Sequence, residues 1–244
     1  MTTTLTHPLA LERLADAARM NPFSVYHAAI AIATHARPTL KPQLIHEQLE
    51  RYTRDVQHLL NHNNAHAPSL RHVLFDRYGY YGSRIQYHDP RNSYIDQVLS
   101  RRTGLPILLT LIYVETARRV GASAHGIGLP GHFVAALDLD GPSTPRLYVD
   151  CFNHGAVLSE DDCRRTAQAA GTPWHDDFLQ PLAPLPWTLR ILSNLRQAYL
   201  EKNDLPNTIA VLEQMLFLDP ANPARQAELQ SLRTALDRHI ARNN

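Results

Sequence analysis

Cysteine and lysine are scarce in this sequence. Its 244 residues include two cysteines, Cys151 and Cys163, and two lysines, Lys41 and Lys202. Two cysteines are too few for a disulfide framework in a chain of this length, so we predict a reducing compartment and a cytoplasmic location. The preference for arginine can reflect the genome that encodes the chain, and we infer no binding property from it, although arginine forms forked contacts with carboxylates.

Neither sign of charge dominates, and long apolar runs are missing. With 24 basic and 23 acidic residues, the formal net charge is +1. Such a chain has no strong field to hold a polyanion, so we predict no nucleic-acid partner. Its longest apolar stretch, Leu105 to Val114, is interrupted by Pro106 and Thr110 and is much shorter than the ~20 residues that span a bilayer. Met1 to Ala10 has no basic segment followed by a long apolar region, so we expect neither a secretory signal nor a membrane partner.

The remaining composition is that of an ordinary globular protein. Hydrophobic residues make up 44% of the chain and charged residues 19%. The length corresponds to one or two domains. A chain of this size can build a core without disulfides or a structural metal.

The first part of the chain has the pattern of helices separated by proline. Apolar residues at helical spacing predict helices over residues 9–20, 22–35, 43–60 and 69–78. The second of these is rich in alanine and largely apolar, which is typical of a buried helix, and Pro22 suits its first position. We predict that residues 1–68 form a helical region that packs on the core of the protein.

The middle of the chain changes from helical spacing to alternation. A helix is predicted to end at Gly104, and a nearly apolar helix follows from Pro106 to Val120, which indicates a central buried helix. After Gly121, alternation predicts strands over residues 124–128, 133–138 and 146–150. Ser159 is a predicted cap for a helix that ends near Ala170. We assign residues 69–170 to the core.

The last part of the chain is helical again. Residues 171–186 contain four prolines and no periodicity, which predicts a connector and a domain boundary. Two amphipathic helices follow between Trp187 and Pro220, and a third runs from Pro223 to about Ala241. Residues 187–244 thus hold about one and a half helical hairpins, and a lone hairpin must dock on another surface to bury its apolar face.

Three features follow one another along the core in an order that suggests a site. A buried helix begins after Gly104, His132 enters a strand, and Asp150 ends the next strand. A helix N-terminus stabilises an anion, a histidine can accept a proton, and an aspartate can orient the imidazole. Enzymes with a thiol nucleophile, a base and an orienting carboxylate have this order.

Several motifs together resemble a known family. The segments Asp89–Ser93, Val98–Ile107, Pro130–Phe133 and Asp150–Gly155, with Ile112-Tyr113, are similar to the transglutaminase-like proteins grouped with the bacterial SirB invasion-regulator family. The resemblance extends from about Leu70 to Ala241. It implies an α+β protein with a mostly helical N-terminal region, a transglutaminase-like and papain-related core with a small antiparallel sheet, and a C-terminal tail like a tetratricopeptide repeat.

One position departs from the catalytic transglutaminase-like enzymes, and the resemblance implies that this departure is shared by the SirB-type family. In those enzymes the nucleophilic cysteine stands two residues after a glycine, in the first turn of the central helix, where this chain has Pro106. Proline carries no nucleophile and suits a first helical turn. His132 and Asp150 occupy the places of the base and its orienter. The resemblance therefore implies a non-catalytic interaction or regulatory module that binds an unidentified protein or peptide.

Two other functions remain open for these residues. His132, oriented by Asp150, could activate water, which would make the protein a peptidase or amidase without a thioester. Cys151 could be a relocated nucleophile, although alternation along a strand turns it away from the face that Asp150 occupies. In the interaction module, His132 and Asp150 would instead be a hydrogen-bonded remnant that rigidifies the strands.

Six residues are candidates for recognition at the cleft that the resemblance implies. They are Asn92, Arg101, Arg102, Gly104, Phe133 and Asn153. The two arginines and the asparagine could bind a carboxylate or a peptide backbone, or they could simply stabilise a helix end and a turn.

Metal and cofactor sites are not predicted. Although His58, His62 and His66 are spaced by four, no carboxylate or cysteine lies between them to complete a zinc site. The chain also has no glycine-rich phosphate loop, so we expect neither a metal nor a cofactor.

Overall fold

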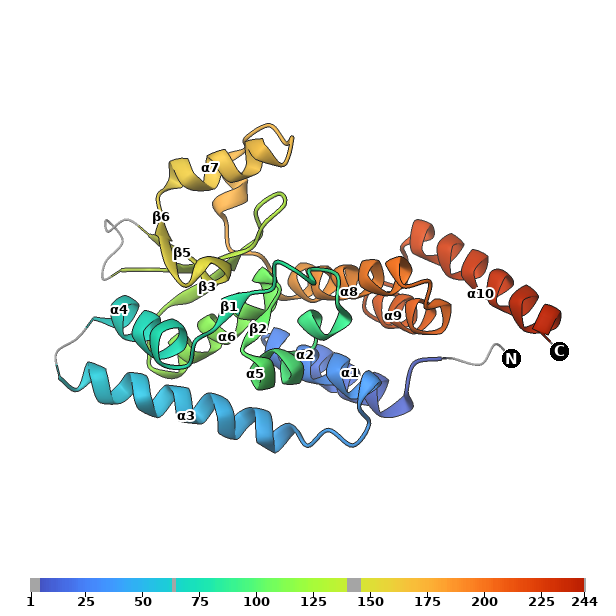
Figure 1. The fold of residues 1–244 in the computed structure, drawn as a ribbon, viewed down its shortest axis with the longest axis horizontal. Coiled ribbons are helices and arrows are strands. Elements are labelled where there is room, and N and C mark those ends of the chain that lie inside the picture. Colours follow the sequence, from blue (N-terminus) through green and yellow to red (C-terminus); the bar gives the residue numbers. More distant parts are fainter. Residues whose placement is uncertain (1–4, 63–64, 140–145, 244) are drawn as a thin grey trace. The chain divides into compact units, whose positions relative to one another are not determined.

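The chain forms two compact units, each built from separate stretches of sequence. The computed structural model describes residues 5–62, 65–139 and 146–243 (Figure 1). Unit 1 comprises Met1–Leu40, His88–Tyr94 and Pro184–Asn244, and unit 2 comprises Lys41–Tyr87 and Ile95–Ala183. The predicted segments 1–68, 69–170, 171–186 and 187–244 divide the chain differently. The first two helices pack with the C-terminal helices, whereas the third packs with the central helix.

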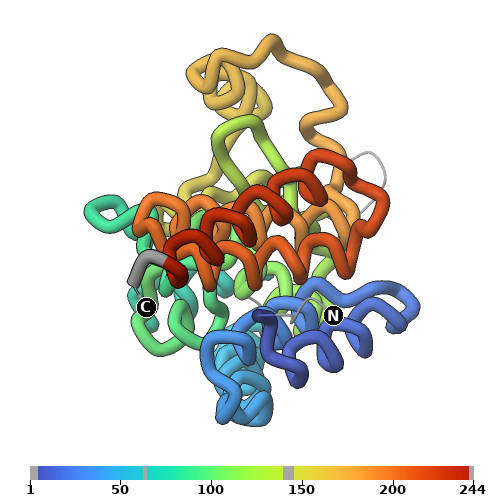
Figure 2. The backbone as a smooth tube through the Cα atoms, turned by 90° about the vertical axis from the view of Figure 1, so that its right-hand side faces the viewer, coloured from blue at the N-terminus to red at the C-terminus, as the bar shows by residue number. Residues whose placement is uncertain are grey.

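Unit 1 is entirely helical in the part that the structure describes. Its elements are α1 (Pro8–Arg19), α2 (Val25–Ala36), the 3₁₀ turn η2 (Pro90–Ser93), α8 (Pro184–Glu201), α9 (Leu205–Leu218) and α10 (Pro223–Asn243). Helix α1 packs on α2, and the successive helices α8, α9 and α10 lie side by side (Figure 2). Helix α2 is buried along most of its length and also packs against α8.

Two helix starts in unit 1 differ from the predicted ones. Helix α2 begins at Val25 rather than Pro22, because the hydroxyl of Ser24 accepts a hydrogen bond from the backbone N–H of His27 and so caps the helix. Helix α8 begins at Pro184, so the last residues of the predicted connector 171–186 are its first turn. Proline is tolerated there because the first turn needs no N–H donor.

Unit 2 is built around a central helix and a small sheet. Its helices are α3 (Pro42–Leu60), α4 (His66–Arg71), α5 (Ile95–Arg101), α6 (Pro106–Arg119) and α7 (Glu160–Ala169), with a π-helical turn η1 (His72–Arg77) and 3₁₀ turns η3 (Cys151–Asn153) and η4 (Asp176–Leu179). Its strands are β1 (Tyr81–Gly82), β2 (Thr103–Gly104), β3 (Ala124–Ile127), β4 (Val134–Leu137), β5 (Leu147–Asp150) and β6 (Ala156–Leu158).

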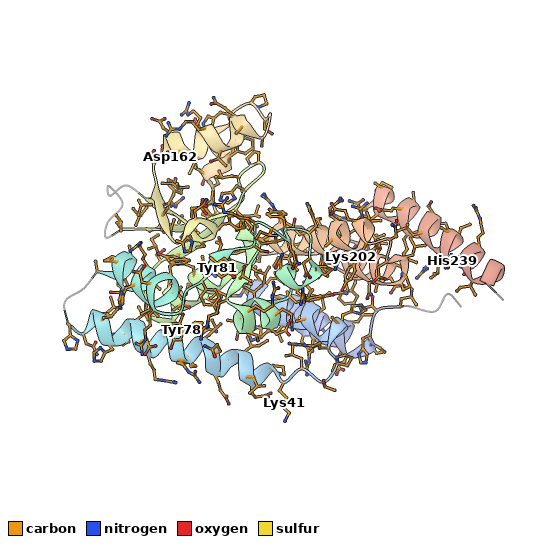
Figure 3. All side chains as sticks on the ribbon, in the orientation of Figure 1. Lys41, Tyr78, Tyr81, Asp162, Lys202 and His239 are labelled. Atoms are coloured by element: carbon orange, nitrogen blue, oxygen red, sulfur yellow. The ribbon has the colours of Figure 1, made fainter. Side chains whose placement is uncertain are left out.

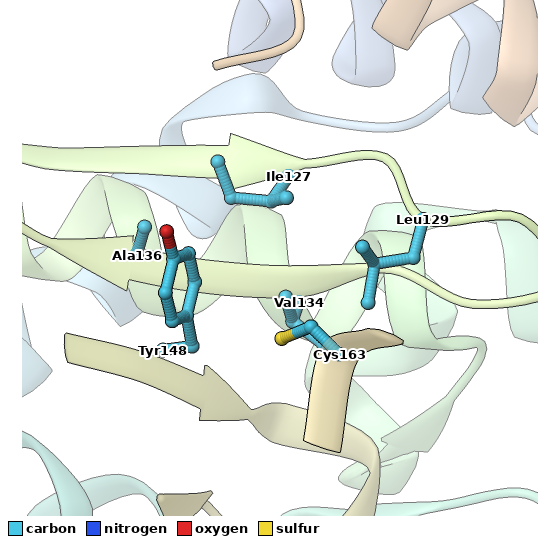
Figure 4. Close-up of a cluster of buried hydrophobic side chains, with 6 residues drawn as sticks. All are labelled: Ile127, Leu129, Val134, Ala136, Tyr148 and Cys163. Carbon is cyan, nitrogen blue, oxygen red and sulfur yellow. The ribbon is translucent and has the colours of Figure 1, made fainter. Parts of the chain in front are cut away.

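The four longer strands form an antiparallel sheet in the order β3-β4-β5-β6, and β1 pairs with β2 in parallel. One face of the sheet packs on α6. The other face carries a cluster of buried side chains that α7 helps to cover (Figure 4): Ile127, Leu129, Val134, Ala136, Tyr148 and Cys163. The predicted α+β class with a small antiparallel sheet is confirmed. Strands β1, β2 and β6 were not predicted, since two or three residues are too few to show alternation.

Helix α6 is the centre of unit 2, as its sequence predicts. Every residue from Pro106 to Val114 is buried, and the helix packs against α3, β3 and β4. Arg118 and Arg119 lie in its last turn, where positive charge stabilises the helix C-terminus. In the part of the chain that the structure describes, no helix combines the length and apolar character needed to cross a membrane.

Candidate functional site

His132 and Asp150 meet at one end of the sheet in unit 2. His132 precedes β4, and Asp150 is the last residue of β5, which runs antiparallel to β4. The Nε2 atom of His132 lies 3.0 Å from Oδ2 of Asp150. The side chains are 15% and 6% exposed, so the carboxylate is buried while the imidazole keeps limited access to solvent.

Asp150 also organises the turn that follows it. Its Oδ1 accepts hydrogen bonds from the backbone N–H groups of Phe152 and Asn153, at 3.0 and 3.1 Å. Its Oδ2 accepts another from Nδ2 of Asn153, at 2.7 Å. Burial alone would raise the pKa of Asp150, but His132, Asn153 and the backbone donors outweigh burial and lower it. Asp150 is therefore an anchored carboxylate that caps η3.

The Phe152 ring forms a wall beside the pair. It meets the His132 ring edge-on, with the ring centroids 6.1 Å apart. The guanidinium of Arg84 lies over the same ring, 5.3 Å from its centroid, and donates a hydrogen bond to Oδ1 of Asn153. A Cβ atom at Gly82 would overlap the Phe152 ring, so only glycine lets β1 pass this close. Arg84, Asn153, Asp150 and His132 thus form a continuous polar chain.

The position of the expected nucleophile holds a proline. Pro106 is buried in the first turn of α6, and η3 packs against this helix. Cys151 is fully buried, and its thiol lies near the hydroxyl of Thr110 and the ring of Tyr113, both on α6. Burial, together with the charge of Asp150, raises the pKa of the Cys151 thiol far above its ordinary value.

The second cysteine is also removed from solvent. Cys163 belongs to the buried cluster between α7 and the sheet. Burial, with nearby carboxylates, raises the pKa of its thiol to about 12. A thiolate nucleophile is therefore disfavoured at both cysteines near neutral pH.

Two of the six recognition candidates lie at the pair. Asn153 bridges Asp150 and Arg84. Phe133 directly follows His132, its side chain is buried, and its carbonyl accepts a hydrogen bond from the Thr110 hydroxyl at 3.5 Å. Phe133 therefore packs in the interior beside the pair.

Arg101, Arg102 and Gly104 form the end of α5 and the start of β2. The prediction that Gly104 ends this helix is wrong, since α5 ends at Arg101 and Arg102 takes the left-handed conformation, with φ of 56°. Arg102 thereby turns the chain so that Gly104 pairs with Gly82. Its guanidinium lies 5.7 Å from the centroid of the Tyr78 ring.

Asn92 belongs to unit 1. It is fully buried within η2, which packs against α8. The hydroxyls of Tyr94 and Tyr199 lie 2.8 Å apart and hold the same segment on that helix. The carboxylate of Asp89 caps η2, the role that the sequence had suggested for Asn92. The structure thus places Asn92 in a different compact unit from the pair.

The described residues contain no group of three or more histidine, cysteine or acidic side chains arranged to hold a metal. Nδ1 of His62 lies 2.8 Å from the carbonyl of His58, and Nε2 of His66 lies 3.3 Å from the carbonyl of Val120. These two histidines therefore contact backbone oxygens, a role that spacing in the sequence does not distinguish from metal ligation.

A second histidine–aspartate pair lies at the opposite end of the sheet. Nε2 of His125, on β3, is 2.7 Å from Oδ2 of Asp138, which directly follows β4. The Ser123 hydroxyl donates to Asp138 at 2.7 Å, and Nε of Arg146 donates to it at 2.8 Å. Neither this cluster nor Arg84 is visible in the local sequence pattern, because both depend on contacts across a sheet or between distant stretches of chain.

Comparisons with known proteins place these observations in a family context. Residues 43–193 match the family model described as the transglutaminase-like superfamily. A UPF0162 protein of Xylella fastidiosa is 37% identical over 161 residues, which cover 64% of this chain and 56% of the relative. A UPF0162 protein of Pseudomonas aeruginosa is 24% identical over 230 residues, covering 91% of this chain and 82% of the relative.

The similarity extends to part of a eukaryotic protein. F-box only protein 21 of Mus musculus is 33% identical over 104 residues, which cover 39% of this chain and 16% of that protein. The aligned part of the chain spans little more than half of the Xylella fastidiosa relative, at 56%. No solved structure is significantly similar to the chain.

Proposed function

We propose that the chain, which belongs to the transglutaminase-like superfamily, is a non-catalytic member that binds a protein or peptide at the end of the sheet marked by His132 and Asp150. The observation that carries this proposal is Pro106 in the first turn of α6. Acyl transfer through a thioester needs a thiolate at that helix N-terminus, and a proline ring cannot supply one.

The surroundings of Cys151 support the same proposal. A thiol replaces a missing nucleophile only if it can ionise and reach the substrate. Cys151 is fully buried against α6, and burial raises the pKa of its thiol. Its neighbour Asp150 adds a negative charge that further opposes ionisation.

The hydrogen bonds of Asp150 also favour a structural role. The carboxylate accepts from two backbone N–H groups and from Asn153, besides its contact with His132. An aspartate that only orients a catalytic imidazole does not need to cap a turn. The pair therefore ties the start of β4 to η3 and gives the binding surface a fixed shape.

A hydrolase without a covalent intermediate is the second candidate. His132 keeps 15% of its side chain exposed and lies 3.0 Å from a carboxylate whose pKa is lowered. An ionised aspartate can orient an imidazole as a general base toward water. The protein would then cleave peptides or amides.

The two candidates differ in turnover. Wild type, His132→Ala and His132→Gln are incubated with a library of fluorogenic peptide amides, and folding is checked by thermal unfolding. The non-catalytic proposal expects no turnover above buffer in any variant. Hydrolysis by wild type that drops at least about 100-fold in both variants, with folding intact, would overturn it and establish the hydrolase.

The proposal also covers the branch of the family to which the chain belongs and the role of its C-terminal helices. We propose that the chain is a SirB-type member of the family. We also propose that it is cytoplasmic, and its two free, buried cysteines agree with a reducing compartment. Helices α8, α9 and α10 would be a tetratricopeptide-like tail with a second contact surface. A hollow of about 530 Å³ supports this, lined by Leu185, Pro186, Leu189, Arg190, Ser193, Asp219 and Arg225.

A further inference from the structure

Exposed apolar side chains occur in two segments of unit 2, around residues 81–87 and 153–157, which contact each other near the His132–Asp150 pair. Tyr81 and Ile85 are 46% and 99% exposed, and Tyr87 is 37% exposed (Tyr81 is marked in Figure 3). Val157, on β6, is 60% exposed. Exposed apolar side chains that form a contiguous patch often mark a site of protein interaction. We call residues 81–87 and 153–157 the rim surface.

The two segments of the rim surface are in direct contact. The Tyr81 and His154 rings stack with their centroids 6.5 Å apart. The Tyr87 ring meets Phe152 edge-on at 6.1 Å, and Arg84 binds Asn153. The rim surface is therefore continuous, and the Asn153 amide joins it to Asp150.

The two edges of the sheet differ in what covers them. Beside β3, Pro181 forms a bridge with Ile127, and the N–H of Leu182 donates to the carbonyl of Gly126 at 2.8 Å. Strand β6 pairs with β5 alone among the described strands. An edge strand leaves half of its N–H and C=O groups unpaired, and an extended peptide can pair with them.

The charge of the rim surface is positive and preorganised. The rim surface, residues 81–87 and 153–157, contains one formally charged side chain, Arg84, and no acidic one. Within the described part of the chain, Arg84 contacts an amide and an aromatic ring but no carboxylate. These contacts hold the guanidinium in place and leave it free to pair with a carboxylate. Binding an anion would therefore cost the Arg84 side chain little further conformational entropy.

We propose that the rim surface binds an extended peptide segment that adds to β6 as a further strand. The segment presents a carboxylate side chain to Arg84 and, beside it, a large apolar side chain to Tyr81 and Ile85. This inference rests on the proposed binding function and names its partner chemistry. Charge complementarity selects an acidic segment, the open edge selects an extended one, and the exposed rings select an apolar neighbour.

Peptide selection tests the charge complementarity. The full chain, Arg84→Glu and the control Arg54→Glu, an exposed arginine on α3, are each used to select from a displayed library of random linear peptides. Wild type and Arg54→Glu should enrich aspartate or glutamate next to aromatic or branched residues. Arg84→Glu should lose this preference and enrich lysine or arginine. Failure to enrich any peptide, or the same enrichment in Arg84→Glu, overturns the proposal.

Backbone methylation then tests strand addition. One selected peptide is synthesised with N-methyl groups on alternate residues, in the two possible registers, and its affinity is measured by fluorescence anisotropy. One register should weaken binding by at least about tenfold, because it blocks the N–H groups that pair with β6, and the other should not. Equal effects in both registers would overturn the strand model.

The outcome is independent of the turnover assay. Hydrolysis that depends on His132 would overturn the non-catalytic function while leaving the peptide preference of Arg84 to be decided by selection. Conversely, loss of the peptide preference would leave the absence of turnover untouched.

The variant Ile85→Ser tests the apolar contact. Because the Ile85 side chain is exposed to solvent, the variant should fold normally, and its affinity for the selected peptide should fall several-fold.

Discussion

Unit 2 contains two histidine–aspartate pairs at opposite ends of one sheet, and their contact distances are similar. Nε2 of His132 lies 3.0 Å from Asp150, and Nε2 of His125 lies 2.7 Å from Asp138. The aspartate side chains are 6% and 36% exposed. By distance alone, the exposed pair would be the stronger candidate for a functional site. The pairs differ in the burial of the aspartate and in the groups that bind it.

The partners of each carboxylate explain the difference. Asp150 is held by backbone N–H groups of η3, and Asp138 is held by the side chains of Ser123 and Arg146. At the second pair, Ser123 and Asp138 both face the Nε2 atom of His125. A proton relay uses the two ring nitrogens for different groups. The cluster therefore ties β3 to β4 and is not a catalytic triad, although it contains the three residue types.

The largest expected effect is a difference between the two aspartates in their contribution to the free energy of unfolding. Asp150→Ala leaves buried donors unpaired and removes the cap of η3, so we expect a loss of about 3 kcal/mol in the free energy of unfolding. Asp138→Ala should cost less than about 1 kcal/mol, because solvent screens an exposed ion pair. Urea denaturation of both variants measures the difference.

Asp150→Asn is the matched control. The amide keeps the shape of the side chain and one oxygen acceptor for the backbone, so it should recover a large part of the loss. Equal losses for Asp150→Ala and Asp138→Ala would show that the buried pair is no better anchored than the exposed one.

The wall beside the buried pair gives the second prediction. In Gly82→Ala, the new methyl group would overlap the Phe152 ring, and we expect a loss of about 2 kcal/mol from overpacking. The smaller side chain of Phe152→Leu should relieve this clash, so Gly82→Ala should cost less in that background. The double-mutant cycle by urea denaturation measures the coupling. Additive losses would contradict the close approach of β1 to η3.

The predictable part of this site consists of local patterns. Pro106 suits a helix start, and the apolar residues behind it predict the buried helix α6. Alternation predicts β4 and β5, and with them the approach of His132 to Asp150 at one end of the sheet. Each of these inferences uses residues that are close in sequence or that a periodic pattern relates.

The unpredictable part depends on single contacts across the fold. Arg84 and Asn153 are 69 residues apart and lie in segments with no periodicity. The left-handed conformation of Arg102, which starts β2, is unusual for a residue with a side chain. The division into units likewise depends on which apolar faces meet across the fold, and neither the apolar sequence of α2 nor the amphipathic sequence of α3 names its partner helix.

The smallest expected effect compares the two aspartates during acidification. The pKa of each is lowered in the folded protein, since their hydrogen-bond partners outweigh burial. A lowered pKa contributes stability that is present above the unfolded value of about 3.9 and is lost as the pH falls through the folded value. Unfolding free energies of wild type, Asp150→Asn and Asp138→Asn, measured from pH 6 downward, should show the loss of stability beginning near pH 4 in wild type and a shallower loss in each variant.

Added salt separates the two contributions within that experiment. Asp138 is exposed and faces Arg146, so 0.5 M salt, with a Debye length of roughly 4 Å, should reduce its share of the acid-dependent loss. Asp150 is buried and held by backbone donors, so its share should persist. If salt removes both contributions equally, the carboxylate at the His132 site is solvated like the exposed one, and the rigid anchor that the binding surface requires is absent.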